Sequence, residues 1–186
     1  MIYFTSDTHF CHTKEFLFTP RGFTNVEDMN LTIVANWNDI VQPDDDVYHL
    51  GDFVMNDIDA GIELIKQLNG RIHLIRGNHD TDAKVQRYLE CPNIVEIKWA
   101  DMIKYKKNYF FLSHFPMIPK TPEDEPSKQD MYNLHGHTHQ QDSIKDNFFI
   151  YHVGMDSHCC RPVSIDEVWE EIKAARRSYY ENVEDN

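Results

Sequence analysis

Five short segments gather the side chains of this sequence that could do chemistry. They are Asp7-Thr8-His9, Gly51-Asp52, Gly77-Asn78-His79-Asp80, His114 and Gly136-His137-Thr138-His139. Carboxylate, imidazole and amide groups suit Mn, Fe, Zn, Ni or Co better than they suit ions that prefer thiolates. Residues two apart share one face of a regular strand, so we expect Asp7 and His9 to point the same way. The last segment repeats this spacing, and together these residue types indicate a metal site.

Each segment taken alone also has an ordinary structural interpretation. An Asp-x-His is usually a surface pair, and a Gly-Asp after a strand is usually a turn. Asn78 or Asp80 could cap a helix by accepting hydrogen bonds from backbone N–H groups. Five such segments in this order are harder to explain as separate surface features, so we favour the metal-binding interpretation.

Apolar runs of β type come directly before these polar segments. Strands are expected over residues 2–6, 47–50, 72–75, 94–105, 109–113 and 148–153. In α/β sheets, ligands collect beyond the carboxyl ends of the strands. The polar segments could therefore surround one hollow.

Helical periodicity separates the strands of the first half. Helices are expected over residues 25–40, 58–68, 82–89 and 164–179, the last with a capping box of Ser164 and Glu167. The alternation predicts an α/β fold in which helical crossovers join the strands of a sheet. The second half is expected to hold mostly antiparallel strands. Residues 116–130 are polar and rich in proline, which is typical of a loop.

Length, charge and cysteine content limit the possible functions. The 186 residues suit one compact domain over residues 1–180, with an acidic tail over residues 181–186. A formal net charge of −13 argues against extended nucleic acid as a partner but does not exclude a small phosphate ligand. The cysteines form no CxxC pair, and the sequence has neither a secretory signal nor an apolar run that could span a bilayer. We expect a cytoplasmic protein with no membrane partner.

In order and spacing, the five segments resemble the motif set of the calcineurin-like metallophosphoesterases. The resemblance spans positions 7 to 139, and residues 153–156 and 161–163 also resemble small single-domain members. It implies two mixed β-sheets packed as a sandwich with helices outside, in αββα layers. One departure is Met55, where the family often carries an acidic residue. That residue is usually not a ligand, so the departure concerns supporting contacts.

The resemblance also implies roles for the polar residues of the five segments. It implies two divalent metal ions (Mn, Fe, Zn or Ni), one held by Asp7, His9 and His139, the other by Asn78, His114 and His137, with Asp52 bridging both. The catalytic residues would be His79, which stabilises the transition state or protonates the leaving oxygen, and Asp80, which orients His79.

The implied reaction is hydrolysis of a phosphate mono- or diester by a hydroxide that bridges the two metals. A small phosphate ester, including a nucleotide, fits the acidic chain better than a long nucleic acid does. Two alternatives stay open: a non-catalytic metal-binding interaction scaffold of the same fold, and a nuclease. The sequence does not indicate an oligomeric state.

Several further polar residues are expected to be structural. His49 and His73 lie inside predicted strands, and Arg76 is expected to pair with carboxylates. His12 follows His9 by three residues and could reach a phosphate, but a surface position is the favoured interpretation.

Overall fold

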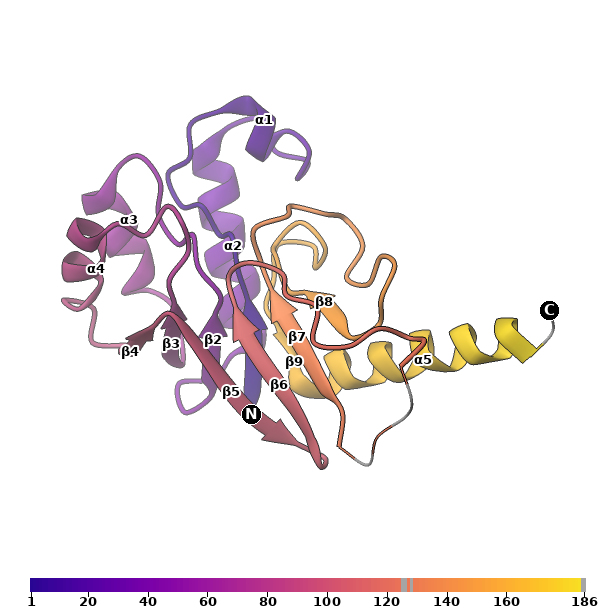
Figure 1. Cartoon of the computed structure of the whole chain (residues 1–186). Coiled ribbons are helices and arrows are strands. Elements are labelled where there is room, and N and C mark those ends of the chain that lie inside the picture. Colours follow the sequence, from indigo (N-terminus) through magenta and orange to yellow (C-terminus); the bar gives the residue numbers. More distant parts are fainter. Residues whose placement is uncertain (125–126, 128, 185–186) are drawn as a thin grey trace.

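The computed structural model describes residues 1–124, 127 and 129–184 (Figure 1). The strands are β1 (Ile2–Thr5), β2 (Asp46–His49), β3 (Arg71–Ile75), β4 (Ile94–Lys98), β5 (Ala100–Tyr105), β6 (Asn108–Ser113), β7 (Met131–His135), β8 (Ile150–His152) and β9 (Val163–Ser164). The helices are α1 (Glu15–Phe18), α2 (Val26–Ile40), α3 (Ile58–Ile65), α4 (Asp82–Tyr88) and α5 (Ile165–Glu184).

These strands form two mixed sheets. The first has the order β4-β3-β2-β1-β9, with β1 to β4 parallel and β9 antiparallel to β1. The second has the order β5-β6-β7-β8, with β5 antiparallel to β6 and the other pairs parallel. The predicted α/β class, with two mixed sheets and flanking helices, is confirmed.

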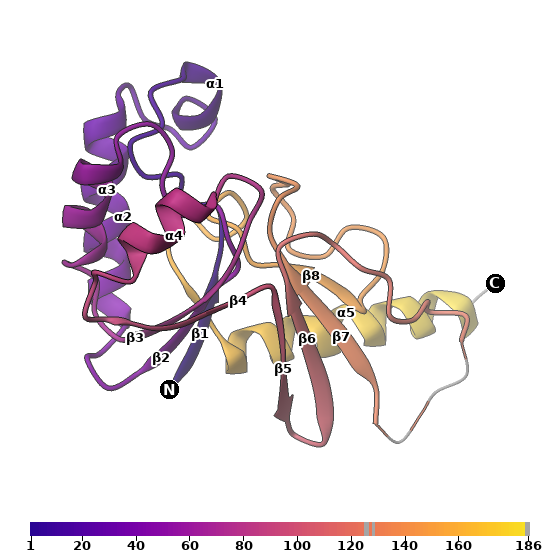
Figure 2. The same ribbon diagram turned by 60° about the vertical axis from the view of Figure 1, so that its left-hand side comes forward.

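Two buried apolar clusters hold the layers together. The first includes Ile33 and Trp37 of α2 and Ile62 of α3, which pack against the first sheet. The second includes Phe4 of β1 and Phe110 of β6, together with residues of α5, so it joins the two sheets. Figure 2 shows α2, α3 and α4 gathered on the first sheet and α5 running along the second. Burial of apolar surface between these layers is the main stabilising term of such a fold.

Local side-chain signals set the helix ends. The Asn25 side chain accepts a hydrogen bond from Asp28 N (2.8 Å) at the start of α2. At the start of α5, Glu167 N donates to Ser164 Oγ (3.2 Å) and Ser164 N donates to Glu167 Oε2 (2.9 Å), so the predicted capping box is present. Helix α5 continues to Glu184, so residues 181–184, which we expected in the tail, are helical; residues 185 and 186 lie outside the described part.

The single strand predicted over residues 94–105 is wrong. The chain breaks at Trp99, where β4 leaves the first sheet and β5 enters the second. A corner of this kind occurs where a strand changes sheets. Apolar periodicity does not reveal it, because β-type residues continue on both sides of the corner.

The prediction of mostly antiparallel strands in the second half is also wrong. Both β6–β7 and β7–β8 are parallel. Parallel neighbours require long return connections, and here the connections are the segments 114–130 and 136–149. The described residues of 116–130 contain no helix or strand, as expected of a loop; 125, 126 and 128 lie outside the description. No described helix is both long enough and apolar enough to cross a membrane.

Candidate metal centre

The structure brings the five polar segments to one place. They lie beyond the carboxyl ends of β1, β2, β3, β6 and β7. His114 Nδ1 lies 2.8 Å from Leu50 O, which ties the end of β6 to the loop after β2. The backbone N of His137 donates to Asp7 Oδ2 (2.9 Å), which ties the loop after β7 to the end of β1. The ends of the two sheets therefore meet at the predicted residues.

Asp7, His9 and His139 form the first group of possible ligands. The two Nε2 atoms of His9 and His139 are 3.2 Å apart. Asp7 Oδ1 lies 3.7 Å from His9 Nε2 and 3.9 Å from His139 Nε2. Ligands held about 2.1 Å from one ion stand about 3.0–3.4 Å apart in octahedral or tetrahedral geometry. The separations seen here are close to that range.

The second group of possible ligands lies around His114. Its Nε2 is 2.9 Å from Asn78 Oδ1 and 3.5 Å from Asp52 Oδ2. Asn78 Oδ1 is also 3.0 Å from His137 Nδ1. Asp52 Oδ2 lies 3.8 Å from His9 Nε2, so this one oxygen stands between the two groups. The seven residues named as ligands are thus close together, and Asp52 lies between the two groups.

Polar atoms without partners show that this donor set fits a cation. Asp7 Oδ1 and His9 Nδ1 are buried without a hydrogen-bond partner, whereas Asp7 Oδ2 accepts hydrogen bonds from Ser6 Oγ (2.6 Å) and His137 N. An unpartnered buried carboxylate oxygen destabilises the fold unless a positive charge reaches it. If the Nδ1–H of His114 is donated to Leu50 O, the Nε2 lone pair faces the oxygens of Asn78 and Asp52. A divalent cation beside Asp7 Oδ1 would satisfy this oxygen, and the Nε2 atoms of His9 and His139 stand close enough to bind the same cation.

The comparison with known families agrees with this chemistry. The sequence model of the calcineurin-like phosphoesterase superfamily domain matches residues 1–154. The chain belongs to the calcineurin-like phosphoesterase superfamily. The resemblance stated from the five motifs is therefore confirmed.

Relatives of this calcineurin-like superfamily member occur in an archaeon, a phage and a bacterium. The uncharacterized protein MJ1445 of Methanocaldococcus jannaschii is 37% identical over 140 residues, which cover 74% of this chain and 69% of that protein. The Gene 66 protein of Mycobacterium phage L5 is 28% identical over 195 residues, covering 90% and 92% of the two chains. The crystal structure of AQ665 from Aquifex aeolicus, a protein of unknown function, has a TM-score of 0.67 and 27% identity, covering 91% of this chain and 98% of that chain.

The candidate ligands of this phosphoesterase are held by strained backbone. Left-handed φ angles occur at Asp7 (55°), His9 (48°), Asp52 (59°), His137 (68°) and His139 (49°). The expectation that the paired residues share one face of a regular strand is therefore wrong, because each lies past the strand end. Such conformations cost about 1–3 kcal/mol each and persist where surrounding contacts enforce them. Their clustering at one place is typical of a functional site.

Two glycines let the loops approach closely. A β-carbon at Gly77 would overlap Asp52 Oδ1, and one at Gly136 would lie 2.6 Å from Asp7 Oδ2 and 2.5 Å from Ser6 Oγ. Only glycine allows these carboxylates to sit against the neighbouring backbone.

Arg21 and Asp156 were missed by the sequence analysis. Arg21 Nε and Nη2 donate to the two carboxylate oxygens of Asp156, each at 2.9 Å, and both side chains are buried. Asp156 Oδ2 lies 2.9 Å from His139 Nδ1, and Arg21 Nη2 also donates to Asp7 O (2.8 Å). A carboxylate behind a ligand histidine orients its ring. Asp156 belongs to the 153–156 motif, but no sequence signal pairs it with Arg21.

We expected the Asp80 carboxylate to orient the His79 side chain through a hydrogen bond, but it binds other groups. Among the described residues its carboxylate accepts hydrogen bonds from Gly77 N (2.8 Å), Asp52 N (2.8 Å), Phe53 N (3.2 Å) and Tyr88 OH (3.0 Å), and none from His79. Asp80 therefore holds the loop that carries Asp52. The reason is topological, since the ends of β2 and β3 are neighbours and Asp80 fills the space between them.

His79 and His12 lie at the rim of the ligand groups. The His79 side chain is 46% exposed, and its Nε2 is 3.9 Å from Asp52 Oδ2. His12 is buried, with its ring centroid 5.6 Å from that of His9, so the expected surface position is wrong. His49 is buried in β2, and its Nε2 lies 3.0 Å from Thr8 Oγ1, which agrees with a structural role.

Burial and charge give the two carboxylates opposite protonation tendencies. Burial raises the pKa of Asp7, and the nearby histidines only partly oppose it. Burial also acts to raise the pKa of Asp52, but the hydrogen bond and charge of His114, the backbone N–H of His79 and the charge of His9 together outweigh it and lower the pKa to about 2. Burial holds the pKa of His9 well below its ordinary value, which favours the neutral imidazole that binds metals.

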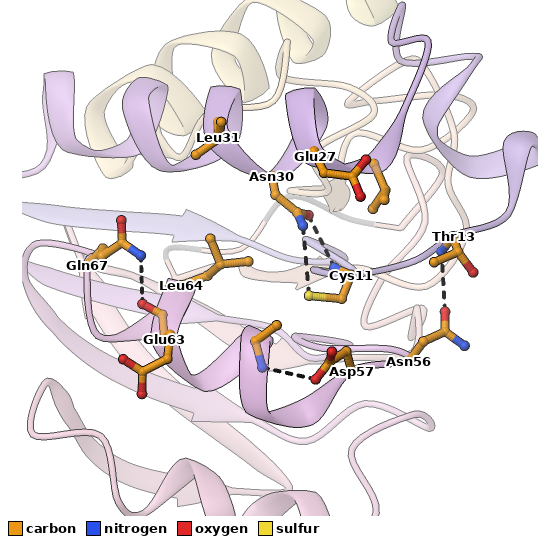
Figure 3. Close-up of a pocket in the computed structure, with 12 residues that line it drawn as sticks. Cys11, Thr13, Glu27, Asn30, Leu31, Asn56, Asp57, Glu63, Leu64 and Gln67 are labelled. Carbon is orange, nitrogen blue, oxygen red and sulfur yellow. Dashed lines mark hydrogen bonds between the residues drawn. The ribbon is translucent and has the colours of Figure 1, made fainter.

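A further cavity lies away from the candidate ligands. A groove of about 490 Å³ lies between α2 and α3 and contains none of the seven candidate ligands. Figure 3 shows Asn30 reaching from α2 toward Cys11, and Leu31 and Leu64 along the two helices. Cys11 N donates to Asn30 Oδ1 (3.2 Å), so a buried hydrogen bond joins α2 to the loop after β1 on one side of the groove. We call this cavity the α2–α3 groove.

Proposed function

We propose that this chain is a dinuclear, metal-dependent phosphoesterase that hydrolyses a phosphate mono- or diester. The observation that supports it most is the position of Asp52 Oδ2, 3.8 Å from His9 Nε2 and 3.5 Å from His114 Nε2. Asp7, His9 and His139 would hold one ion, and Asn78, His114 and His137 the other. Mn, Fe, Zn and Ni all suit this set of oxygen and nitrogen donors.

When bound, such a pair of ions lowers the pKa of water and stabilises charge on the transferring phosphoryl group. Among the seven proposed ligands, Asp7 and Asp52 are the only carboxylates, so they offset half of the charge of two dications. The remaining local positive charge favours a phosphate, although the chain as a whole carries −13. The neutral amide of Asn78 preserves this excess.

His79 is proposed as the catalytic acid. Its imidazole is half exposed at the rim, where it can touch a substrate, and its backbone N is anchored to Asp52 Oδ1 (2.8 Å). During hydrolysis, oxygen from water bonds to phosphorus, the bond to the leaving oxygen breaks, and the water gives one proton to the solvent. His79 would donate a proton to the leaving oxygen and then regain one from the solvent. Asp80 is proposed as a positioning residue that keeps Asp52 and the neighbouring loop in place.

We propose a small phosphate ester, such as a nucleotide, as substrate, because an acidic surface disfavours long polyanions. We further propose that residues 1–180 form one domain that works in the cytoplasm. The cysteines Cys11, Cys91, Cys159 and Cys160 are all free, which is usual in a reducing compartment.

The test is reconstitution. Metal-free protein is loaded with Mn²⁺, Fe²⁺, Zn²⁺ or Ni²⁺, and metals per chain are counted by mass spectrometry. Turnover is then measured on bis-p-nitrophenyl phosphate, p-nitrophenyl phosphate and cyclic nucleotides. We expect two ions per chain and metal-dependent hydrolysis. Two bound ions without any hydrolysis would instead favour the interaction scaffold, and fewer than two ions would exclude the dinuclear site.

A further inference from the structure

A smaller cavity opens directly beside the second ligand group. It has a volume of about 230 Å³ and is lined in part by Asn78 and His114, so whatever fills it adjoins the candidate metal centre. Pockets for drug-sized ligands usually measure about 300–1,000 Å³. A cavity of this size suits one ring system rather than a polymer.

Three large apolar side chains line this cavity and are exposed. They are Trp99 (71% exposed), Phe115 (51%) and Met117 (51%). Large apolar side chains that gather at one exposed place often mark a binding site. We call these three residues the aromatic subsite, after Trp99 and Phe115.

Trp99 is held in place before any ligand arrives. The Arg76 guanidinium lies 4.2 Å from the centroid of the Trp99 ring. Arg76 in turn donates to Asp80 O (2.8 Å) and pairs with Asp82 Oδ1 (2.8 Å). A cation over one face of an indole restrains it, and a restrained side chain loses less entropy when a ligand binds.

Phe115 connects the aromatic subsite to the candidate ligands. Its ring centroid lies 5.1 Å from that of His114 and 4.6 Å from that of His137. An ester substituent that extends from a phosphate at the ligand groups into this cavity would meet Phe115 and Trp99.

We propose that the aromatic subsite binds the nucleobase of a nucleoside phosphate ester whose phosphate occupies the candidate metal centre. The inference rests on the proposed function and adds the residues that would bind the base and so select for a nucleoside phosphate ester. Every nucleobase can stack on an aromatic side chain, so the subsite should accept any nucleobase and not one in particular. An ester of another planar aromatic group could stack in the same way, and the experiment distinguishes such an ester from a nucleoside ester.

Binding is measured with phosphonate analogues, whose P–C bond hydrolysis does not cleave. Isothermal titration of Zn²⁺-loaded protein compares the analogues of adenosine 5′-monophosphate, ribose 5-phosphate and phenyl phosphate. We expect the adenosine compound to bind at least about tenfold more tightly than either of the others, about 1.4 kcal/mol. Tryptophan fluorescence supplies a second readout. Trp37 is buried and Trp169 half-buried, so quenching by the adenosine compound reports on Trp99.

Variants then test which residues give the preference. Trp99→Ala and Phe115→Ala should each reduce the ratio of adenosine to ribose affinity about tenfold, whereas Trp99→Phe should retain most of it. Ile118→Ala is the matched control, since Ile118 is 71% exposed on the same segment but does not line the cavity. A ratio has the advantage that a general loss of phosphate binding cancels.

Three outcomes would overturn the inference. Equal affinity for the adenosine and ribose compounds would show that the aromatic subsite does not bind the base, and the proposed phosphoesterase function would be unaffected. Equal affinity for the adenosine and phenyl compounds would show that the subsite binds any simple aromatic group and does not select for a nucleobase. Failure of all three analogues to bind metal-loaded protein would reject the proposed function itself.

Discussion

The α2–α3 groove and the candidate metal centre differ in how they are built. The groove, about 490 Å³, is larger than the cavity of about 230 Å³ beside the candidate metal centre, yet the groove contains the ordinary buried hydrogen bond from Cys11 N to Asn30 Oδ1. The candidate metal centre contains an unpartnered carboxylate oxygen at Asp7 and an unpartnered ring nitrogen at His9. It also contains five of the ten left-handed non-glycine residues in the described part of the chain, whereas the groove is lined by one of them, Cys11.

The difference teaches that energetic cost marks a functional site better than volume does. Left-handed non-glycine residues and buried unpartnered polar groups each oppose folding. A chain retains several of them at one place only if other contacts or a ligand compensate. Cavities between helices, by contrast, arise whenever two amphipathic helices pack imperfectly over a sheet. Changes in the candidate metal centre should therefore alter metal binding and turnover, whereas changes in the α2–α3 groove should not.

The largest effect is expected from Asp52→Asn. An amide there replaces the negative oxygen that we propose as the shared ligand by a neutral group. Metal content should fall below two ions per chain, and turnover should fall about 10³-fold or more, because several kcal/mol of charge stabilisation are lost. Metal content and kcat are measured on the same samples.

Glu63→Gln in the α2–α3 groove is the matched control, since it makes the same chemical change at an exposed carboxylate. It should leave metal content and kcat unchanged. Two ions retained by Asp52→Asn would contradict the shared-ligand role and would weaken the contrast between the regions.

The next effect is expected from His79→Ala. Removal of a general acid lowers turnover about 10²–10⁴-fold. Metal content should not change, because His79 belongs to neither ligand group. Turnover should recover toward the wild-type rate on a substrate with a good leaving group, such as a p-nitrophenyl ester, which needs less protonation. Normal activity toward a poor leaving group at normal metal content would exclude the assignment.

A smaller effect is expected from Asp156→Asn. The change weakens the interaction that orients His139 and leaves the Arg21 guanidinium without its anionic partner. Loss of such a supporting carboxylate typically lowers metal affinity about 10- to 100-fold. Calorimetric titration with Zn²⁺ measures the change. An unaltered affinity would show that the backbone of the loop, rather than Asp156, positions His139.

The sequence predicted which segments meet but not how they are held. Strand ends before Asp7, Asp52 and Asn78 follow from local apolar patterns, and such patterns can be read within a window of a few residues. The Arg21–Asp156 pair joins residues that are 135 positions apart, and no local pattern encodes it. Likewise, the corner at Trp99 and the parallel direction of β7 depend on pairing between distant strands. Periodicity indicates which residues are buried, but it does not indicate a strand's neighbour or direction.

The smallest effect is expected from Asn30→Ala in the α2–α3 groove. This change leaves the buried Cys11 N without an acceptor, which costs about 1–3 kcal/mol of unfolding free energy. Denaturant titration measures the loss, and a Zn²⁺ titration of the folded variant should give an affinity within about twofold of wild type. Cys11 lies only two residues after His9, and its own φ is also left-handed (62°). If the Zn²⁺ affinity of Asn30→Ala fell as far as that of Asp156→Asn, the loop over residues 7–11 would couple the groove to the candidate metal centre. The two regions would then not be functionally separate.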